Sequence, residues 1–403
     1  MTSLLGRVGQ GVGRVYPHVD RDVWLLRRRL AVRAPMARLD AVARTLPLGR
    51  TRPAGDVHLV VVVHDGPDVP NWKVAGGNHF YEVNQSAVEA LGADRVTLFA
   101  VGRDEPTAAW QERLIRTVAD VGATHLIAQI EVDPNQHGQW NWDVVLPVLS
   151  RHWSGASIGL MYDSAYEWLR IRAHRLGRQT RQLLIAELCE PMTGFVRAGQ
   201  YEVGPMTMPL SQESIAAIDA YVAGQPKQYD VSFIGALYDY RVEMLDRLRA
   251  SGLTVAVNPH RADDPATYEA SRTNQPTYLD YMAGLARSEL TINFSLANGG
   301  PHEQYKIRVH EAALVGCIPL TDDGDRTRHF YAPNEYQFFG SIADLSDVIT
   351  ARLADRDRLR ADQAAARERA HELSRSDFWG RIDVGLQRRG LPVLTGLRPP
   401  ASP

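Results

Sequence analysis

The chain has 403 residues, 44% of them hydrophobic and 23% charged, a composition typical of a globular protein with about two or three folding units and not of a disordered or fibrous one. Its formal net charge of -2 gives no argument for nucleic-acid binding. The two cysteines, Cys189 and Cys317, each lie in an apolar context, which argues against a disulfide framework or a cysteine-built zinc site and favours two buried thiols. No apolar run approaches the roughly 20 residues that span a bilayer, and the N-terminus lacks the features of a signal peptide. We therefore expect a cytoplasmic protein.

The N-terminal segment, residues 1–55, is basic. Residues 1–52 contain eleven arginines and three aspartates, a balance of +8. Within them, residues 22–46 mix apolar and arginine positions at roughly helical spacing. Two interpretations are open: a helix that lies on an anionic membrane surface or docks an acidic partner, and a solvated helix that packs on the domain after it.

The next unit, residues 56–225, alternates short apolar runs with longer amphipathic stretches. The apolar runs predict strands at 57–65, 94–102, 124–132 and 157–163. The amphipathic stretches predict helices at 83–93, at 106–123 and at 142–153, the last interrupted at Pro147. Further short elements follow between 182 and 210, and residues 211–228 predict a helix and then a linker.

The same alternation repeats in the next unit, residues 226–380. Strands are predicted at 229–237, 253–258, 290–295 and 317–323. Helices are predicted at 240–252, at 278–288, in a stretch ending near Gly316, and over most of 342–373. Residues 381–403 form a tail whose proline-rich end we expect to be disordered. Strands that alternate with helices predict an α/β fold with two helix-covered parallel sheets, and ligands bind at the carboxyl ends of such strands.

The richest motif is HEQYKIRVHEAALVGCIPL, residues 302–320. It predicts a polar loop that runs into a helix whose first free N–H groups, near Tyr305, Ile307 and Arg308, form an anion site. Lys306 and Arg308 add positive charge there, so phosphate is the natural guest. Glu303 precedes the helix and Glu311 lies inside it, and each carboxylate can accept hydrogen bonds from hydroxyl groups. One carboxylate for each of two polyols beside a diphosphate describes a nucleotide-sugar.

Glu303, seven intervening residues and Glu311 resemble the E-x7-E signature of retaining glycosyltransferases with the GT-B fold, those of glycosyltransferase family 4. The following EAALVGCIPLTDD is similar to the family's E-A-x-x-x-G-x-P segment, and KIRVHEAALVGCIPL is also similar to CgeB-like members. The resemblance implies two Rossmann-like domains that face a central cleft. It also implies that Glu303 contacts the donor sugar and Glu311 the ribose.

Two further segments resemble the family. FIGALYDYR, residues 233–241, is similar to the strand and loop that open the donor domain, which implies that Gly235 and Arg241 bind the donor diphosphate; Ala236 stands where an arginine is common. Residues 73–99 are similar to the glycine pair, helix and strand that begin such enzymes, so Gly76 and Gly77 would let the backbone approach a ligand closely.

The chain departs from the family after the strand 157–163. Tyr162 and Asp163 stand where many members have a histidine, which implies that Asp163 supplies the sugar contact on that side. We therefore assign catalytic roles to Glu303, Asp163 and Lys306. Taken singly, each of these side chains is equally compatible with a capping or solvated surface role. Acidic pairs at 263–264 and 322–323 fit solvated loops better than a metal site, so no metal is expected.

The sequence thus predicts a glycosyltransferase of the hexosyltransferase type, active in polysaccharide or glycoconjugate biosynthesis. It would move a sugar from a nucleotide-diphosphate donor to an acceptor hydroxyl, with retention and without a metal. The nucleotide-sugar is a co-substrate, and no cofactor or nucleic-acid partner is expected. Two alternatives remain open: a nucleotide-sugar epimerase on the same fold, and a non-catalytic relative that binds carbohydrate or a partner protein.

Overall fold

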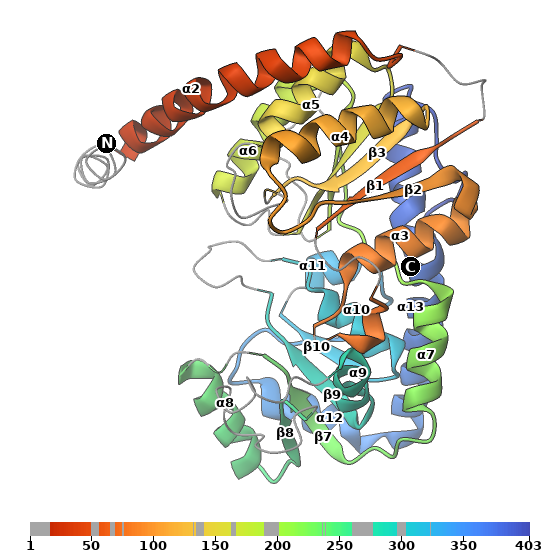
Figure 1. The fold of residues 1–403 in the computed structure, drawn as a ribbon. Helices are drawn as coiled ribbons and strands as arrows, with labels where there is room; N and C mark the ends of the chain where they lie inside the picture. The colour runs from red at the N-terminus through yellow and green to blue at the C-terminus, as the bar shows by residue number, and fades with distance from the viewer. Residues whose placement is uncertain are drawn as a thin grey trace.

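The computed structural model describes residues 17–49, 56–64, 69–74, 76–131, 133, 141–162, 167–188, 201–235, 237, 239–259, 277–295, 304–322 and 324–403. These residues form two α/β domains, one above the other in Figure 1. Each domain is built on one parallel sheet, as the alternation of strands and helices predicts.

The first domain has six strands in the order β2-β1-β3-β4-β5-β6. They are β1 (Leu59–Val63), β2 (Val96–Ala100), β3 (His125–Gln129), β4 (Ala156–Met161), β5 (Leu183–Glu187) and β6 (Tyr201–Val203). Successive residues of β1 point to opposite faces: Val60 and Val62 enter one core cluster, whereas Leu59, Val61 and Val63 enter the other. A strand buried on both faces needs apolar residues throughout, which explains the valine run.

The helices of this domain cover both faces of the sheet. They are η1 (Asn71–Lys73), α3 (His79–Leu91), η2 (Ala93–Arg95), α4 (Thr107–Asp120), α5 (Asn141–His152) and α6 (Glu167–Gln179). The predicted interruption at Pro147 is wrong, because α5 continues through it. Val144, Val145, Val148 and Leu149 around the proline are all buried, and this packing compensates for the lost backbone hydrogen bond.

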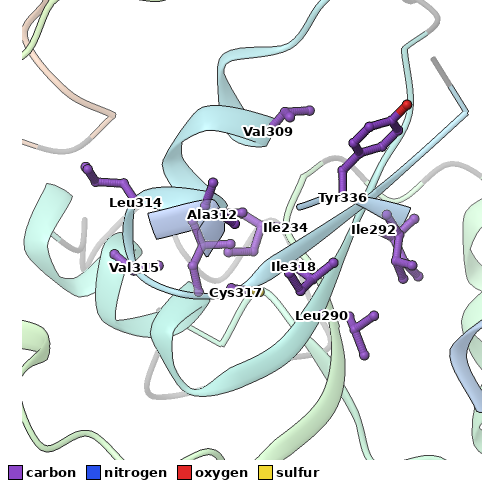
Figure 2. Close-up of a cluster of buried hydrophobic side chains, with 14 of the residues drawn as sticks. Ile234, Leu290, Ile292, Val309, Ala312, Leu314, Val315, Cys317, Ile318 and Tyr336 are labelled. Carbon is purple, nitrogen blue, oxygen red and sulfur yellow. The ribbon is translucent and has the colours of Figure 1, made fainter. Parts of the chain in front are cut away.

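The second domain has five strands in the order β11-β10-β9-β7-β8. They are β7 (Tyr229–Phe233), β8 (Val255–Val257), β9 (Ser288–Asn293), β10 (Ile318–Thr321) and β11 (Gln337–Phe338). Figure 2 shows part of its core, where Leu290, Ile292 and Ile318 from neighbouring strands lie near Val309 and Ala312 of a covering helix. Cys317 is buried in the same cluster as a free thiol, as predicted; Cys189 lies outside the described residues.

The helices of the second domain are α7 (Gln212–Val222), α8 (Asp239–Ala250), α9 (Tyr278–Ala286), α10 (Ile307–Leu314), α11 (Gly324–Thr327), α12 (Leu345–Ala354) and α13 (Arg356–Arg388). The sequence placed α7 in the first unit. Its buried residues Ile215, Ile218 and Val222 belong instead to the core of the second domain, so the chain has already changed domain at Leu210.

Helix α13 joins the two domains and does not stop at residue 380. Leu359 and Leu373 pack in the second core, whereas Phe378 and Ile382 pack in the first. The predicted disorder of the proline-rich end is also wrong, because the Arg369 guanidinium donates to the carbonyl of Ala401 at 2.7 Å. The carboxylate of Asp383 accepts hydrogen bonds from the backbone N–H groups of residues 394–396 at 2.6–2.9 Å, which holds the tail against the helix.

Helix α2 (Pro17–Arg44) confirms the predicted N-terminal helix. It lies along the outside of the first domain, next to α5 (Figure 1). Val32 and Leu39 are buried in the core of that domain, so one face of α2 packs on the domain as the second interpretation requires. No described helix is both long and apolar enough to cross a bilayer.

Each sheet reverses its direction of growth at one point. In the first sheet this point lies between β1 and β3, and in the second between β7 and β9. Parallel α/β sheets bind ligands outside the carboxyl ends of the strands at such a switch point. His64 follows β1 and Gly235 lies just after β7. The topology therefore predicts that a ligand binds near the loops that follow these two strands.

Candidate functional site

The start of α10 lies beside the ends of β9 and β10. The backbone N–H of Gln304 donates to the carbonyl of Ser295 at 2.9 Å, and the N–H of Ser295 donates to Asp322 Oδ1 at 2.7 Å. Lys306 is the N-cap residue, its side chain makes no capping hydrogen bond, and the first turn contains no acidic residue. The Lys306 ammonium donates to the side chain of Gln304. This helix start therefore combines a positive dipole end with a nearby cation.

Glu311 lies in the second turn of α10 and is only 6% exposed. Its Oε1 accepts a hydrogen bond from the Tyr278 hydroxyl at 2.7 Å, and its Oε2 accepts one from the Tyr281 hydroxyl at 2.6 Å. Burial raises the pKa of the Glu311 carboxyl, while the two tyrosine hydrogen bonds and the charge of Arg308 oppose that rise. The carboxylate is thus fixed in direction by its own domain.

The sequence analysis did not identify the two tyrosines. They come from α9, whose start is fixed by a capping box between Thr277 and Asp280. The rings of Tyr278 and Tyr281 stack with centroids 5.6 Å apart. Their spacing of three residues puts both hydroxyls on one face of the helix, and this spacing is the sequence signal that could have indicated them.

Gly77 of the first domain lies next to Tyr278 of the second domain. Its φ is +80°, and a Cβ there would lie 2.7 Å from Asn71 Oδ1 and 3.6 Å from the ring of Tyr278. Any larger residue would therefore be strained and would clash with Asn71, while its Cβ would be in van der Waals contact with Tyr278 of the second domain. Gly76 also has a positive φ of +79°, but a Cβ there would meet nothing within 4 Å. Tyr278 thus lies between Gly77 of the first domain and Glu311 of the second.

Arg308 and Gly235 extend this group in the second domain. Gly235 has φ +147° and donates its N–H to Asn258 Oδ1 at 2.9 Å. Arg308 Nη1 lies 3.9 Å from the position that a Cβ on Gly235 would take. Arg308 also hydrogen-bonds Tyr281. A guanidinium therefore lies between the glycine after β7 and the carboxylate of Glu311.

Arg241 lies at the start of α8, beside the same glycine. Its guanidinium carbon is 5.1–5.4 Å from the ring centroids of Phe233, Tyr240 and Phe294, and its Nε donates to the Tyr240 hydroxyl at 2.9 Å. A Cβ on Gly235 would lie 3.4 Å from the Phe233 ring. The aromatic rings hold the predicted phosphate-binding cation by cation–π contacts.

A pocket of about 530 Å³ opens in the first domain next to Gly77. Its lining residues come from the loop before α3, the start of α3 and the ends of β3 and β4: Val69, Val74, Gly77, Asn78, His79, Phe80, Gln129 and Tyr162. The backbone N–H of Tyr162 donates to the buried carboxylate of Glu131 at 2.6 Å. Except for Gly77, the sequence analysis assigned no binding role to these residues, because single polar and aromatic side chains carry no spacing signal.

Another buried carboxylate, that of Glu82, connects the two domains. Glu82 of α3 accepts a hydrogen bond from the backbone N–H of Ser211 at 2.6 Å and another from the Ser214 hydroxyl. Ser211 is the N-cap of α7. Burial raises the pKa of Glu82 to about 7, although these hydrogen bonds oppose the rise. Glu82 also raises the pKa of Tyr278, so Tyr278 has acidic residues of both domains around it.

The predicted site residues therefore fall into two groups. Gly77, Gly235, Arg308 and Glu311 form one contiguous group, with Arg241 and Lys306 at its margins. Ile307 begins α10 and packs against the core of the first domain. The two catalytic candidates Glu303 and Asp163 lie outside the described residues. Among the residues that are described, no three His, Cys, Asp or Glu side chains cluster as a metal site.

Comparisons with known proteins concern the fold and part of the second domain. Residues 241–377 match the family model described as "Glycosyl transferase-like", which spans Arg241, Arg308 and Glu311. The fold is that of a GT-B glycosyltransferase. A sucrose-phosphate synthase from Thermosynechococcus elongatus matches with a TM-score of 0.53 at 14% identity, covering 83% of this chain and 99% of the other.

An alpha-glucosyltransferase, solved in complex with UDP and a 13-mer DNA containing a central A:G mismatch, matches with a TM-score of 0.50 at 12% identity. The match covers 83% of this chain and 100% of the other. No curated protein matches the sequence. The predicted fold class and the resemblance to GT-B glycosyltransferases are both confirmed.

Proposed function

We propose that this protein is a glycosyltransferase that moves a sugar from a nucleotide-diphosphate donor to an acceptor hydroxyl. The observation that carries the proposal is the group around Glu311. A buried carboxylate, a guanidinium and an uncapped helix start meet at the junction of two domains whose fold is used for nucleotide-sugar chemistry.

The donor would lie against the second domain. Its diphosphate needs cations and N–H donors, which the start of α10, Lys306 and Arg308 supply, with Arg241 close by. The ribose hydroxyls would donate to Glu311, whose oxygens keep acceptor capacity beyond the two tyrosine hydrogen bonds. We propose UDP-sugars as the first donors to test, since the alpha-glucosyltransferase with a TM-score of 0.50 was solved with UDP.

The acceptor would enter the pocket of the first domain. Phe80 and Tyr162 offer ring surfaces, and Gln129 and His79 offer hydrogen-bonding groups. Aromatic faces with a few polar groups suit a carbohydrate ring, which has apolar faces and hydroxyls at its edge. Gly77 lies at the boundary of this pocket and of the Glu311 group, so acceptor and donor would meet there.

The chemistry follows from where charge develops. As the bond from the sugar to the diphosphate breaks, negative charge grows on the leaving phosphate and is stabilised by the start of α10, Lys306 and Arg308. Glu303 and Asp163 are proposed to contact the donor sugar, with retention of configuration. We propose that neither a metal nor a cofactor takes part, because these fixed cations meet the leaving group.

A thermal-shift screen of UDP-, GDP-, ADP- and dTDP-sugars tests the donor. A ligand that binds the folded state at 100 times its Kd stabilises it by about 2.7 kcal/mol, so the correct donor should raise Tm by several degrees. That donor is then incubated with and without oligosaccharide acceptors. Transfer products support the proposal, an epimerised donor without transfer supports the epimerase alternative, and no shift with any nucleotide contradicts a donor site.

A further inference from the structure

Helix α2 has one side packed on the first domain and another side exposed to solvent. Successive α-helical residues are rotated by about 100°, and the buried residues Arg28, Val32, Leu39 and Ala43 therefore share one side. On that side Arg28 donates to Asp143 at 2.6 Å and to Gln179 at 2.5 Å. These contacts fix the rotation of α2 about its axis, so its other side is held toward solvent.

The solvent side carries an apolar stripe. Leu26 and Leu30 are 57% and 71% exposed, and they lie one turn apart. Ala34, Ala37 and Ala41 continue along the same side and are exposed as well. By helical rotation these five residues fall within an arc of about 80°. Among the described residues, Leu26 and Leu30 are the most exposed large hydrophobic side chains, and contiguous exposed apolar surface is typical of interaction sites.

Arginines border this stripe on both sides. Arg27 and Arg38 lie along one edge, Arg29 and Arg33 lie along the other, and all four are exposed. None of them forms an ion pair or hydrogen bond within the part of the chain that the structure describes. The described carboxylate of this helix, Asp40, lies by rotation on the edge of Arg29 and Arg33, but it is only 7% exposed and is paired with Arg44 at 2.5 Å and His152 at 2.9 Å.

We propose that this face of α2 docks on an anionic phospholipid bilayer. A narrow apolar stripe with cationic residues along both edges matches the boundary between acyl chains and headgroups: the leucines enter the apolar layer and the arginines reach the phosphates. Nucleic acid would use the arginines but leave the leucines in water. An acidic protein would need its own apolar strip of the same width. The inference is independent of sugar transfer.

Sedimentation of the full-length protein with vesicles tests this docking. Vesicles of phosphatidylcholine with 30% phosphatidylglycerol should bind the protein, and vesicles of phosphatidylcholine alone should not. At about five-fold per basic residue near an anionic surface, R27A/R29A/R33A/R38A should lose several hundred-fold in partition coefficient, and L26S/L30S about ten-fold or more. The control R247A/R249A removes exposed arginines from α8 and should bind like the wild type.

Three results would overturn the proposal. One is equal binding to neutral and anionic vesicles, or to neither. The second is displacement of the protein from vesicles by duplex DNA, together with equal DNA affinity for L26S/L30S and the wild type. This result would assign the face to nucleic acid. The third is a wild-type dimer by light scattering that L26S/L30S converts to a monomer, which would assign the face to a second copy of the chain.

Discussion

Two helices, one from each domain, begin at the junction and differ in how their first turns are satisfied. In α3 the side chain of Asn78 caps the helix by accepting from the N–H of Tyr81 at 3.0 Å, and Glu82 adds an acidic residue to the first turn. In α10 the N-cap is Lys306, which makes no capping bond, and the first turn has no acid. Among the described residues, the start of α3 has a side-chain cap and an acid and the start of α10 has neither, which is consistent with the proposed anion site at α10.

Each helix also carries a buried carboxylate, and the two are held differently. Glu82 accepts from the backbone and hydroxyl groups at the start of α7, so its donors belong to the other domain. Glu311 accepts from two tyrosines of its own domain. The contacts of Glu82 connect the two domains, whereas the contacts of Glu311 fix the orientation of its carboxylate within the second domain. This difference supports the proposal that the donor binds at α10, whereas α3 connects the two domains.

The largest expected effect is the loss of nucleotide affinity when the Glu311 carboxylate is removed. Glu311→Ala deletes the predicted ribose acceptor and leaves two buried tyrosine hydroxyls without it. We expect nucleotide affinity to fall at least 100-fold, measured by calorimetry with the donor that the screen identifies. Glu368→Ala, an exposed carboxylate on α13, is the control and should bind normally. A folded Glu311→Ala protein with unchanged affinity contradicts the donor site.

The contribution of Glu82 to the free energy of unfolding should depend on pH. Its pKa of about 7 in the folded protein exceeds the ordinary value of 4.5, so the folded state holds the proton more tightly. The associated stability is present below pH 4.5 and is lost as pH rises toward about 7. Between pH 5 and pH 8 this loss is about 2 kcal/mol.

Glu82→Gln removes this titration while keeping an oxygen that can accept from Ser211. Denaturant unfolding at pH 5, 6, 7 and 8 measures the difference between wild type and variant. As the pH rises from 5 to 8, we expect the wild type to lose about 2 kcal/mol of its free energy of unfolding relative to the variant. A difference that is the same at every pH would mean that Glu82 does not titrate between the two domains.

The grouping of residues around Glu311 could be predicted from the sequence far better than the contact between the domains at Glu82. Gly235, Arg308 and Glu311 lie close together because a strand–loop–helix pattern fixes where glycines and helix starts go. Tyr278 was missed because its role depends on which side chains α9 meets in space. The partner of Glu82 is 129 residues away at Ser211, and no local pattern encodes that contact. The predicted domain boundary near 225 failed for the same reason, since an amphipathic helix such as α7 does not specify which sheet it covers.

The smallest expected effects come from substitutions at the starts of α3 and α10, which test whether the two helix starts have different roles. Asn78→Ala removes the cap of α3 and should reduce the free energy of unfolding by about 1 kcal/mol while nucleotide affinity stays unchanged. Lys306→Ala removes a cation from the start of α10 and should weaken nucleotide binding about five- to ten-fold with little loss of stability. Asn78→Ser, which can still cap, should restore the stability of the first variant. If Asn78→Ala weakens nucleotide binding as much as Lys306→Ala does, both helix starts contact the donor, and the division of roles between α3 and α10 is wrong.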